Sequence, residues 1–326
     1  MLRTRAVAAL AVVVGVLLAT LPSAATATAY PDPQTVTGDT AIHDPTMIRL
    51  KDGSYVAYST HGRLEARVSK DRTHWERAAV DAFATPPAWW YAYNDTADPW
   101  APEITYRAGT YWLYYSLSSW GSNHSAIGVA TSASGRPGTW TDRGKVFASE
   151  TGDAWNAIDP YVVEDGDQLW MAFGSYWSGI RMIRLDPRTG KAHTADTAVR
   201  HLATRPDLPY AVEAPAIVKH GAYWYLFNSY DACCSGLSAT YKIKVGRATS
   251  LTGPYTDSGG TPMLRGGGDL LLAGHGRYIG PGGQSLMRDR GADVLVHHYY
   301  DGEDDGAPKL GLNELRWGED GWPSVV

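Results

Sequence analysis

The chain has 326 residues, a formal net charge of −5 and only two cysteines. A mildly acidic chain without a block of lysine or arginine lacks the electrostatic footprint of a protein that binds nucleic acid or an anionic membrane. Two cysteines cannot build a disulfide framework, so a sizeable hydrophobic core must hold the fold.

The first 29 residues have the pattern of a secretory signal peptide. Arg3 and Arg5 precede an uncharged apolar run over residues 6–21, and Ala27-Thr28-Ala29 offers a cleavage site of small residues. The run is short for a membrane span, which needs about 20 apolar residues. We therefore expect a signal peptide over residues 1–29, a secreted extracellular protein, and a working domain over residues 30–326.

The aromatic composition is biased towards residues with a polar edge, with 20 Tyr and 13 Trp against 4 Phe. A flat apolar face beside a polar group suits a surface that contacts sugar rings. The same residues can instead fill the faces of sheets, so composition alone leaves both interpretations open.

Five segments of the chain share one pattern: a proline, a short apolar strand, a turn that contains glycine, and a second strand rich in aromatic residues. This pattern predicts a β-hairpin. The segments cover residues 44–59, 101–116, 159–175, 214–229 and 280–300, with prolines at Pro45, Pro102, Pro160, Pro215 and Pro281. Spacings of 55 to 66 residues between these prolines fit about four short strands, which is the size of one propeller blade.

Helix is expected to be minor, because no segment shows a sustained apolar period of 3.6 residues. We therefore predict an all-β, five-bladed β-propeller in a single domain. A β-sandwich is the alternative, but it does not explain the recurring hairpin.

Acidic residues recur where the repeats begin. Each adjoins a proline or an Ala-Pro pair, and they are Asp44, Glu103, Asp159 and Glu213. The first strand of a blade lines the axial channel, so these acids are expected to face one central space. Converging carboxylates raise one another's pKa, which lets one act as an acid while another stays ionised. A single Asp-Pro is more often a turn, but several in register are typical of a glycoside hydrolase.

The ordered set of motifs resembles glycoside hydrolase family 43, and within it the endo-α-1,5-L-arabinanases. The resemblance covers nearly all of residues 30–326. The motifs that carry it are His43-Asp44-Pro45, Trp100-Ala101-Pro102-Glu103-Ile104, Asn156-Ala157-Ile158-Asp159-Pro160, Phe173-Gly174-Ser175-Tyr176-Trp177-Ser178-Gly179-Ile180, Glu213-Ala214-Pro215, Cys233-Cys234-Ser235-Gly236 and Tyr241-Lys242-Ile243.

The resemblance implies an inverting mechanism with three acidic residues. Asp44 would be the general base, Glu213 the general acid, and Asp159 a third carboxylate that tunes the pKa of the acid and holds it in place. An inverting pair lies about 6.5–9.5 Å apart, which leaves room for a water. Glu103 departs from the family pattern, in which this position is commonly aspartate, and we interpret it as a structural or rim residue.

Six further residues of these motifs are candidates for contact with the substrate. Trp100, Tyr115 and Trp177 are candidate platforms for sugar rings, and His43, Asn156 and Ser175 are candidate polar contacts. For each aromatic residue the alternative is packing between blades.

The resemblance also implies that His298 holds an axial calcium ion surrounded by water. Calcium prefers oxygen ligands, so a histidine that is merely hydrogen-bonded in the channel is the alternative. Gly283 stands where relatives usually carry a histidine, which puts a second imidazole near the sugar in doubt. Cys233 and Cys234 could form a disulfide or remain buried free thiols, and the sequence leaves both possibilities open.

The expected substrate is therefore arabinan of the plant cell wall, cleaved by a monomeric enzyme without nucleic-acid or membrane partners. An exo-acting arabinofuranosidase or a β-xylosidase on the same site is the main alternative. A non-catalytic glycan-binding propeller is a further alternative, but it would lack at least one of the three acids.

Overall fold

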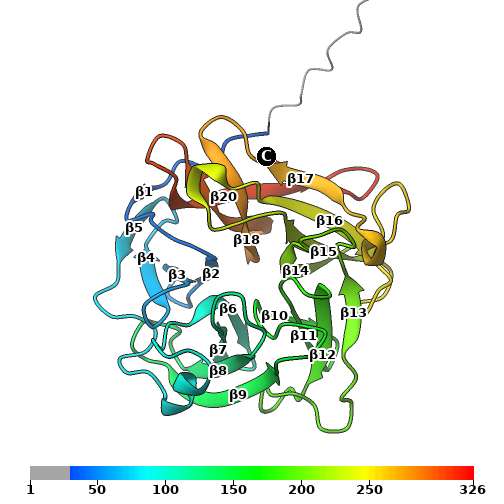
Figure 1. The fold of residues 1–326 in the computed structure, drawn as a ribbon. Helices are drawn as coiled ribbons and strands as arrows, with labels where there is room; N and C mark the ends of the chain where they lie inside the picture. The colour runs from blue at the N-terminus through cyan, green and yellow to red at the C-terminus, as the bar shows by residue number, and fades with distance from the viewer. Residues whose placement is uncertain (1–29) are drawn as a thin grey trace, which may run out of the picture.

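The computed structural model describes residues 30–326, and the expected signal peptide lies outside the described residues. Over these residues the chain forms five β-sheets around one central axis, with three short 3-10 helices (Figure 1). The prediction of an all-β, five-bladed propeller in a single domain is confirmed. In residues 30–326 we find no helix with the length and apolar character needed to cross a membrane.

Each blade is a sheet whose strands follow one another from the axis outwards. Blade 1 contains β2 (Thr46–Arg49), β3 (Tyr55–Ser59), β4 (Glu65–Ser69) and β5 (His74–Arg77). Blade 2 contains β6 (Trp100–Arg107), β7 (Thr110–Leu117), β8 (Ser125–Ser132) and β9 (Thr141–Ser149). Blade 3 contains β10 (Tyr161–Asp165), β11 (Gln168–Phe173), β12 (Ile180–Leu185) and β13 (Arg200–Ala203). Blade 4 contains β14 (Val212–His220), β15 (Tyr223–Tyr230), β16 (Lys242–Ala248) and β17 (Asp269–Ala273). Blade 5 contains β18 (Tyr278–Asp289), β19 (Ala292–Asp301), β20 (Ala307–Trp317) and β21 (Pro323–Val325).

The 3-10 helices lie in the connections between strands. They are η1 (Ala88–Ala92) between blades 1 and 2, η2 (Gly236–Ser238) between β15 and β16, and η3 (Met263–Arg265) between β16 and β17.

The N-terminal segment closes the ring between the first and last blades. Strand β1 (Thr37–Gly38) pairs in parallel with β5 at the outer edge of blade 1. Just after it, Ala41 forms an antiparallel bridge to Lys309 in blade 5, and the Ile42 N–H donates to the Pro308 carbonyl at 3.2 Å. These bonds satisfy edge groups that would otherwise be open to another chain.

The hydrophobic core is divided among the interfaces between neighbouring blades. The buried clusters join blades 1 and 2, blades 2 and 3, blades 3 to 5, and blades 5 and 1. Aromatic residues of the second strands supply much of this packing; in β7, for example, Tyr114 and Tyr115 are both completely buried. Much of the tyrosine and tryptophan excess is therefore explained by packing between sheets rather than by contact with sugar.

Each blade begins with a residue in the left-handed backbone region. The five equivalent residues, with φ between 41° and 57°, are Asp44, Ala101, Asp159, Ala214 and Gly283. This conformation is uncommon for residues with a side chain, and register shifts beside it in blades 2, 4 and 5 mark local β-bulges. The bulge turns the backbone as it enters the channel, so that adjacent side chains point to the axis.

This alignment corrects the expected register of the acidic residues. Asp44 and Asp159 occupy the left-handed position itself, whereas Glu213 precedes that position by one residue and Glu103 follows it by two. In blades 1 to 4 the proline directly follows the left-handed residue, whereas in the fifth blade Pro281 precedes Gly283 by two residues. The four acids are therefore not equivalent, because they stand at different offsets from the left-handed position.

The amide of each left-handed residue is held by a side chain of the preceding blade. In four blades the acceptor lies in the last few residues of the second strand or directly after it. These bonds run from Ala101 to Thr60 Oγ1 at 2.9 Å, from Asp159 to Ser116 Oγ at 2.9 Å, from Gly283 to Ser229 Oγ at 3.0 Å and from Asp44 to His298 Nδ1 at 3.1 Å.

Blade 4 departs from this pattern because the equivalent residue of blade 3 is Gly174, whose own N–H donates to the Ile158 carbonyl at 2.8 Å. Glycine has no side chain to offer, and Asp159 Oδ2 accepts the Ala214 N–H at 3.1 Å instead. The Asp159 side chain of blade 3 is thereby hydrogen-bonded to the backbone of the residue that follows Glu213.

Candidate active site

The carboxylate of Asp44 lies in a cage of donors at the start of blade 1. His43 Nδ1 and Thr60 Oγ1 both contact Asp44 Oδ2, at 2.9 and 2.7 Å. Burial raises the pKa of Asp44, but the adjacent His43 imidazole and the hydrogen bonds from His43 and Thr60 outweigh it and hold the pKa below its usual range. The lowered pKa keeps Asp44 ionised. Its side chain is 21% exposed and so remains accessible.

Glu213 has the opposite electrostatic environment. Its side chain is buried, and burial raises the pKa of its carboxyl above the usual value. Ser175 Oγ donates to Oε2 at 2.5 Å and Tyr241 Oη donates to Oε1 at 2.8 Å, and both bonds oppose the rise. The nearby charge of Asp44 adds to the rise, so an ionised Asp44 favours a protonated Glu213.

Asp159 is the third member of the group. Burial and the charges of Glu213 and Asp44 raise the pKa of Asp159 well above its usual value, against the hydrogen bond from the Ala214 N–H. The three predicted carboxylates are neighbours, because Asp44 and Asp159 line one cavity on the axis and Asp159 Oδ2 accepts the amide of the residue that follows Glu213.

A small cavity lies on the axis where the five blade starts meet. Its volume is about 20 Å³ and its lining includes Asp44, Asp159 and Glu103. A single water needs roughly 10–15 Å³ of such space, so the cavity has room for about one water. It is a narrow channel below the carboxylates and too small to hold a sugar ring.

Glu103 lies inside this channel rather than at the rim of the propeller. Its Oε2 accepts hydrogen bonds from Thr46 Oγ1 at 2.9 Å and Ser285 Oγ at 3.0 Å. Burial raises the pKa of Glu103 to about 8. Glu103 therefore bridges blades 1, 2 and 5 as a largely protonated structural residue.

Two of the three predicted sugar platforms remain available to a ligand. Trp100 and Trp177 are half-buried at the ends of the blades. Tyr115 does not face the site: its ring is completely buried and its hydroxyl donates to Asp142 Oδ1 at 2.7 Å. The prediction that Tyr115 stacks on a sugar is wrong, because its strand turns this side chain into the interface between blades 1 and 2.

The predicted polar contacts act mainly on protein groups. Asn156 is buried and accepts a hydrogen bond from Ser125 Oγ at 2.7 Å, and Ser175 is buried with its hydroxyl on Glu213. Asn156 Oδ1 and the Ser175 hydroxyl are thus engaged with protein groups, and direct contact of either residue with substrate stays a prediction. His43 is half-buried and joins Asp44 to Tyr300, whose hydroxyl lies 2.9 Å from His43 Nε2.

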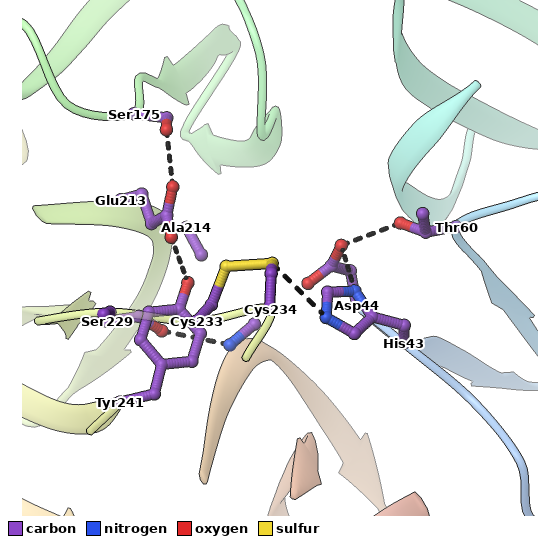
Figure 2. The surroundings of a disulfide bond; sticks show 12 residues. His43, Asp44, Thr60, Ser175, Glu213, Ala214, Ser229, Cys233, Cys234 and Tyr241 are labelled. Carbon is purple, nitrogen blue, oxygen red and sulfur yellow. Dashed lines mark hydrogen bonds and ion pairs between the residues drawn. A yellow bond between two sulfur atoms is a disulfide. The ribbon is translucent and has the colours of Figure 1, made fainter. Parts of the chain in front are cut away.

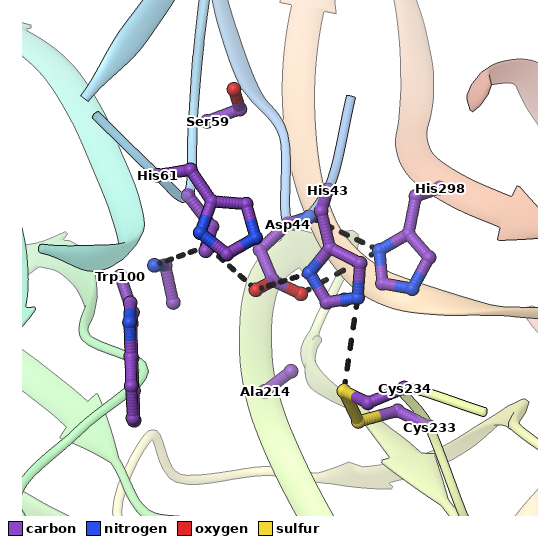
Figure 3. Close-up of polar contacts among 12 residues, drawn as sticks. His43, Asp44, Ser59, His61, Trp100, Ala214, Cys233, Cys234 and His298 are labelled. Atoms are coloured by element: carbon purple, nitrogen blue, oxygen red, sulfur yellow. Dashed lines mark hydrogen bonds and ion pairs between the residues drawn. A yellow bond between two sulfur atoms is a disulfide. The ribbon is translucent and has the colours of Figure 1, made fainter. Parts of the chain in front are cut away.

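His298 stacks on His43, with ring centroids 3.9 Å apart (Figure 3). Its Nδ1 accepts the Asp44 N–H, and its buried Nε2 has no hydrogen-bond partner among the described residues. His43, Asp44 and His298 bring their ligand atoms within 4.8 Å of one another. Because Nδ1 accepts the Asp44 N–H, a neutral His298 carries its proton on Nε2, and that nitrogen could bind a cation only if the proton moved to Nδ1.

Gly283 lies directly against these side chains. A Cβ at this position would stand 2.3 Å from Asp44 Oδ1 and 2.8 Å from His298 Nδ1. No side chain fits there in this arrangement, which agrees with the absence of a second imidazole near the sugar.

Cys233 and Cys234 form a disulfide, which settles the alternative that the sequence left open. In Figure 2 the disulfide lies between the Glu213–Tyr241 pair and the His43–Asp44 pair. Cys234 Sγ is 3.8 Å from His43 Nε2.

The sequence reasoning missed Tyr241, Tyr300 and Thr60 as residues that contact the carboxylates or their partners. Alternation along β19 was a usable signal for Tyr300, because residues two apart in a strand share a face and His298 was already a candidate. Tyr241 stands in a motif that was noted, but nothing in the sequence indicated that its hydroxyl reaches Glu213. Thr60 has no local motif, since its contact depends on packing between blades.

A propeller that brings a carboxyl of lowered pKa and a carboxyl of raised pKa together at its channel has the site of an acid–base glycoside hydrolase. Residues 34–323 match the family described as glycosyl hydrolases family 43.

Individual relatives cover most of the chain. An extracellular endo-α-(1→5)-L-arabinanase 1 of Bacillus subtilis is 44% identical over 291 residues, covering 87% of each protein. An extracellular exo-α-(1→5)-L-arabinofuranosidase of Cellvibrio japonicus is 39% identical over 300 residues, covering 87% of this chain and 86% of the relative. The solved structure of a family 43 endo-arabinanase from Bacillus licheniformis superposes with a TM-score of 0.83 at 43% identity, covering 89% of this chain and 99% of that one. The chain belongs to glycoside hydrolase family 43.

Proposed function

We propose that the protein is a secreted endo-α-1,5-L-arabinanase that cleaves internal bonds of arabinan with inversion at the anomeric carbon. The observation that carries the proposal is the division of protonation between Asp44 and Glu213. His43 and Thr60 favour an ionised Asp44, whereas burial favours a protonated Glu213. The names of the relatives from Bacillus subtilis and Bacillus licheniformis support arabinan as the substrate.

In the proposed mechanism Asp44 accepts a proton from the water that attacks the anomeric carbon. Glu213 donates its proton to the leaving glycosidic oxygen, so each residue starts in the protonation state that its role requires. Asp159 holds the backbone beside Glu213 through the Ala214 N–H, and any charge on Asp159 would favour the protonated form of the acid. Trp100 and Trp177 supply apolar faces for sugar rings.

Three further parts of the proposal rest on separate observations. Secretion is supported by the N-terminal pattern of residues 1–29 and by relatives that are named extracellular. A calcium ion at His298 is supported by the grouping of His43, Asp44 and His298, whose ligand atoms lie within 4.8 Å of one another; when bound, it would supply positive charge that favours the ionised form of Asp44. We further propose that the enzyme acts as a monomer, without nucleic-acid or membrane partners.

The function is tested with the purified protein on debranched arabinan, xylan and aryl glycosides. We expect arabinan to give mixed oligosaccharides, and proton NMR of the first products to show the β-anomer. A single released sugar would favour the exo-acting alternative, to which the Cellvibrio japonicus relative points. Hydrolysis of xylan alone, or α-anomeric first products, would overturn the proposal.

The metal is tested separately from activity. Elemental analysis of the purified protein should find about one calcium per chain, and His298→Ala should release it. A protein that contains no calcium after purification in calcium-containing buffer contradicts this part of the proposal.

A further inference from the structure

The loop that carries the Cys233–Cys234 disulfide has no role in the proposed acid–base mechanism. Cys233 and Cys234 lie in the connection between β15 and β16, beside the Asp44 end of the site (Figure 2). Cys233 is half-buried and Cys234 is exposed. An exposed disulfide between adjacent residues does not staple two distant elements, so its function must be local.

A continuous chain of hydrogen bonds leads from this loop to the proposed base. The Cys234 N–H donates to Tyr300 Oη at 2.7 Å, and Tyr300 Oη lies 2.9 Å from His43 Nε2. His43 Nδ1 lies 2.9 Å from Asp44 Oδ2. Four residues from blades 1, 4 and 5 are thus joined in series.

The donors along this chain determine which nitrogen of His43 carries the proton. An ionised carboxylate only accepts hydrogen bonds, so His43 Nδ1 must donate to Asp44. In the neutral ring Nε2 is then an acceptor, and the Tyr300 hydroxyl donates to it. Tyr300 can direct its proton there because its oxygen already accepts the Cys234 N–H. The order of donors therefore fixes both the ring orientation and the tautomer of His43.

The disulfide accounts for the position of the first donor. Cys234 has a φ of 63°, a left-handed conformation that is uncommon for a residue with a side chain. Since Cys234 is exposed, packing alone does little to hold its amide. The covalent bond to Cys233 restricts the backbone at this point and keeps the N–H directed at Tyr300. Cys234 Sγ also lies 3.8 Å from His43 Nε2.

We propose that the Cys233–Cys234 disulfide is a positioning element for the general base, acting through Tyr300 and His43 on Asp44. The inference rests on the proposed role of Asp44. Cys233, Cys234 and Tyr300 are positioning residues, because the chain places only Asp44 at the reacting water. The disulfide must be intact for the base to hold its full activity.

The test compares three variants with one matched control. Tyr300→Phe removes the central hydroxyl and keeps the ring, and the double substitution Cys233→Ser with Cys234→Ser removes the disulfide. Each should lower kcat on arabinan about tenfold, which corresponds to the loss of one hydrogen bond of about 1.4 kcal/mol, and should change KM less than about twofold. The triple variant should lose no more than Tyr300→Phe alone, because all three residues act through one chain. Tyr299→Phe, on the opposite face of the same strand, should retain wild-type kcat.

Two further measurements separate positioning from a loss of folding. A phosphine reductant acts on this bond alone, since the chain has two cysteines, and should lower kcat by the same factor as the double substitution, reversibly on reoxidation. Nitrogen-15 NMR of labelled histidine should show His43 with its proton on Nδ1 in the wild type, and a shifted Nε2 resonance in Tyr300→Phe because Nε2 loses its hydrogen-bond donor. Additive losses in the triple variant, or an unchanged Nε2 resonance and kcat in Tyr300→Phe, would overturn the inference. Failure of the proposed function is distinct, because then Asp44→Asn itself would remain active.

Discussion

Removing the hydroxyl of Tyr241 should shift the basic limb of the pH profile to higher pH. This hydroxyl donates to Glu213 Oε1 at 2.8 Å and favours the ionised form of the carboxyl. A hydrogen bond to a charged group contributes about 1.5 kcal/mol or more, and one pKa unit corresponds to 1.36 kcal/mol. Tyr241→Phe should therefore raise the pKa of Glu213 by about one unit. A general acid works only while protonated, so activity should persist about one pH unit further into the alkaline range.

The assay is kcat/KM on debranched arabinan as a function of pH, which reports groups of the free enzyme. Tyr230→Phe is the matched control, because it removes a buried hydroxyl of the same blade that donates to the Gly267 carbonyl at 3.1 Å and contacts no carboxylate. Its limbs should stay in place. A basic limb that moves down, or does not move, in Tyr241→Phe would refute the assignment of that limb to Glu213.

Asp159→Asn should abolish hydrolysis yet raise the midpoint of thermal unfolding at pH 7. Because the pKa of Asp159 is raised in the folded protein, the carboxyl makes folding less favourable as the pH rises above about 3.9, the usual pKa of aspartate. Asparagine has no charge to bury and avoids this loss. A lower midpoint in the variant would contradict the prediction. Glu103→Gln should leave kcat within about twofold. It should also remove the loss of folding stability that Glu103 causes between about pH 4.3, its usual pKa, and about pH 8, its pKa in the folded protein. An unfolding midpoint with the same pH dependence as the wild type would contradict this role of Glu103. Gly283→Ala should lower kcat more than about tenfold, because the new Cβ would clash with Asp44 Oδ1. Gly276→Ala is the control, since Gly276 has a similar φ but no atoms near the position of a Cβ, and it should keep its activity. Equal kcat values in the two variants would show that the clash at Gly283 is relieved.

The architecture could be predicted because the blades repeat the same local chemistry. Turns such as Asp52-Gly53 and alternating aromatic strands are properties of short segments, and each segment forms its hairpin with little help from the rest. The orientation of each acid at the axis was less accessible, because it depends on its offset from the left-handed residue, and sequence alone does not reveal that backbone conformation. Asp44 and Glu103 both adjoin a proline, yet Glu103 stands two residues beyond the left-handed Ala101 and lines the channel as a structural residue.

The catalytic acids could be located, but most of their partners could not. Asp44 and Glu213 stand in motifs, whereas their different pKa shifts come from Thr60, Tyr241 and burial, which depend on how blades pack. Tyr115 illustrates the limit: alternation along a strand gives two faces, and only the neighbouring blade decides which one is buried. Gly174 lacks the side chain that accepts the amide of the next blade at the equivalent positions Thr60, Ser116 and Ser229. This difference becomes apparent only when the blades are compared in the structure.

The assignment of Glu213 as acid and Asp44 as base is tested most directly with substrates that need no acid. An aryl arabinofuranoside with a dinitrophenolate leaving group departs without protonation, whereas the sugar oxygen of arabinan does not. Glu213→Gln should therefore lose arabinan hydrolysis and keep most of its kcat on the activated substrate, while Asp44→Asn should lose both. Equal losses on the activated substrate in the two variants would contradict the division of roles.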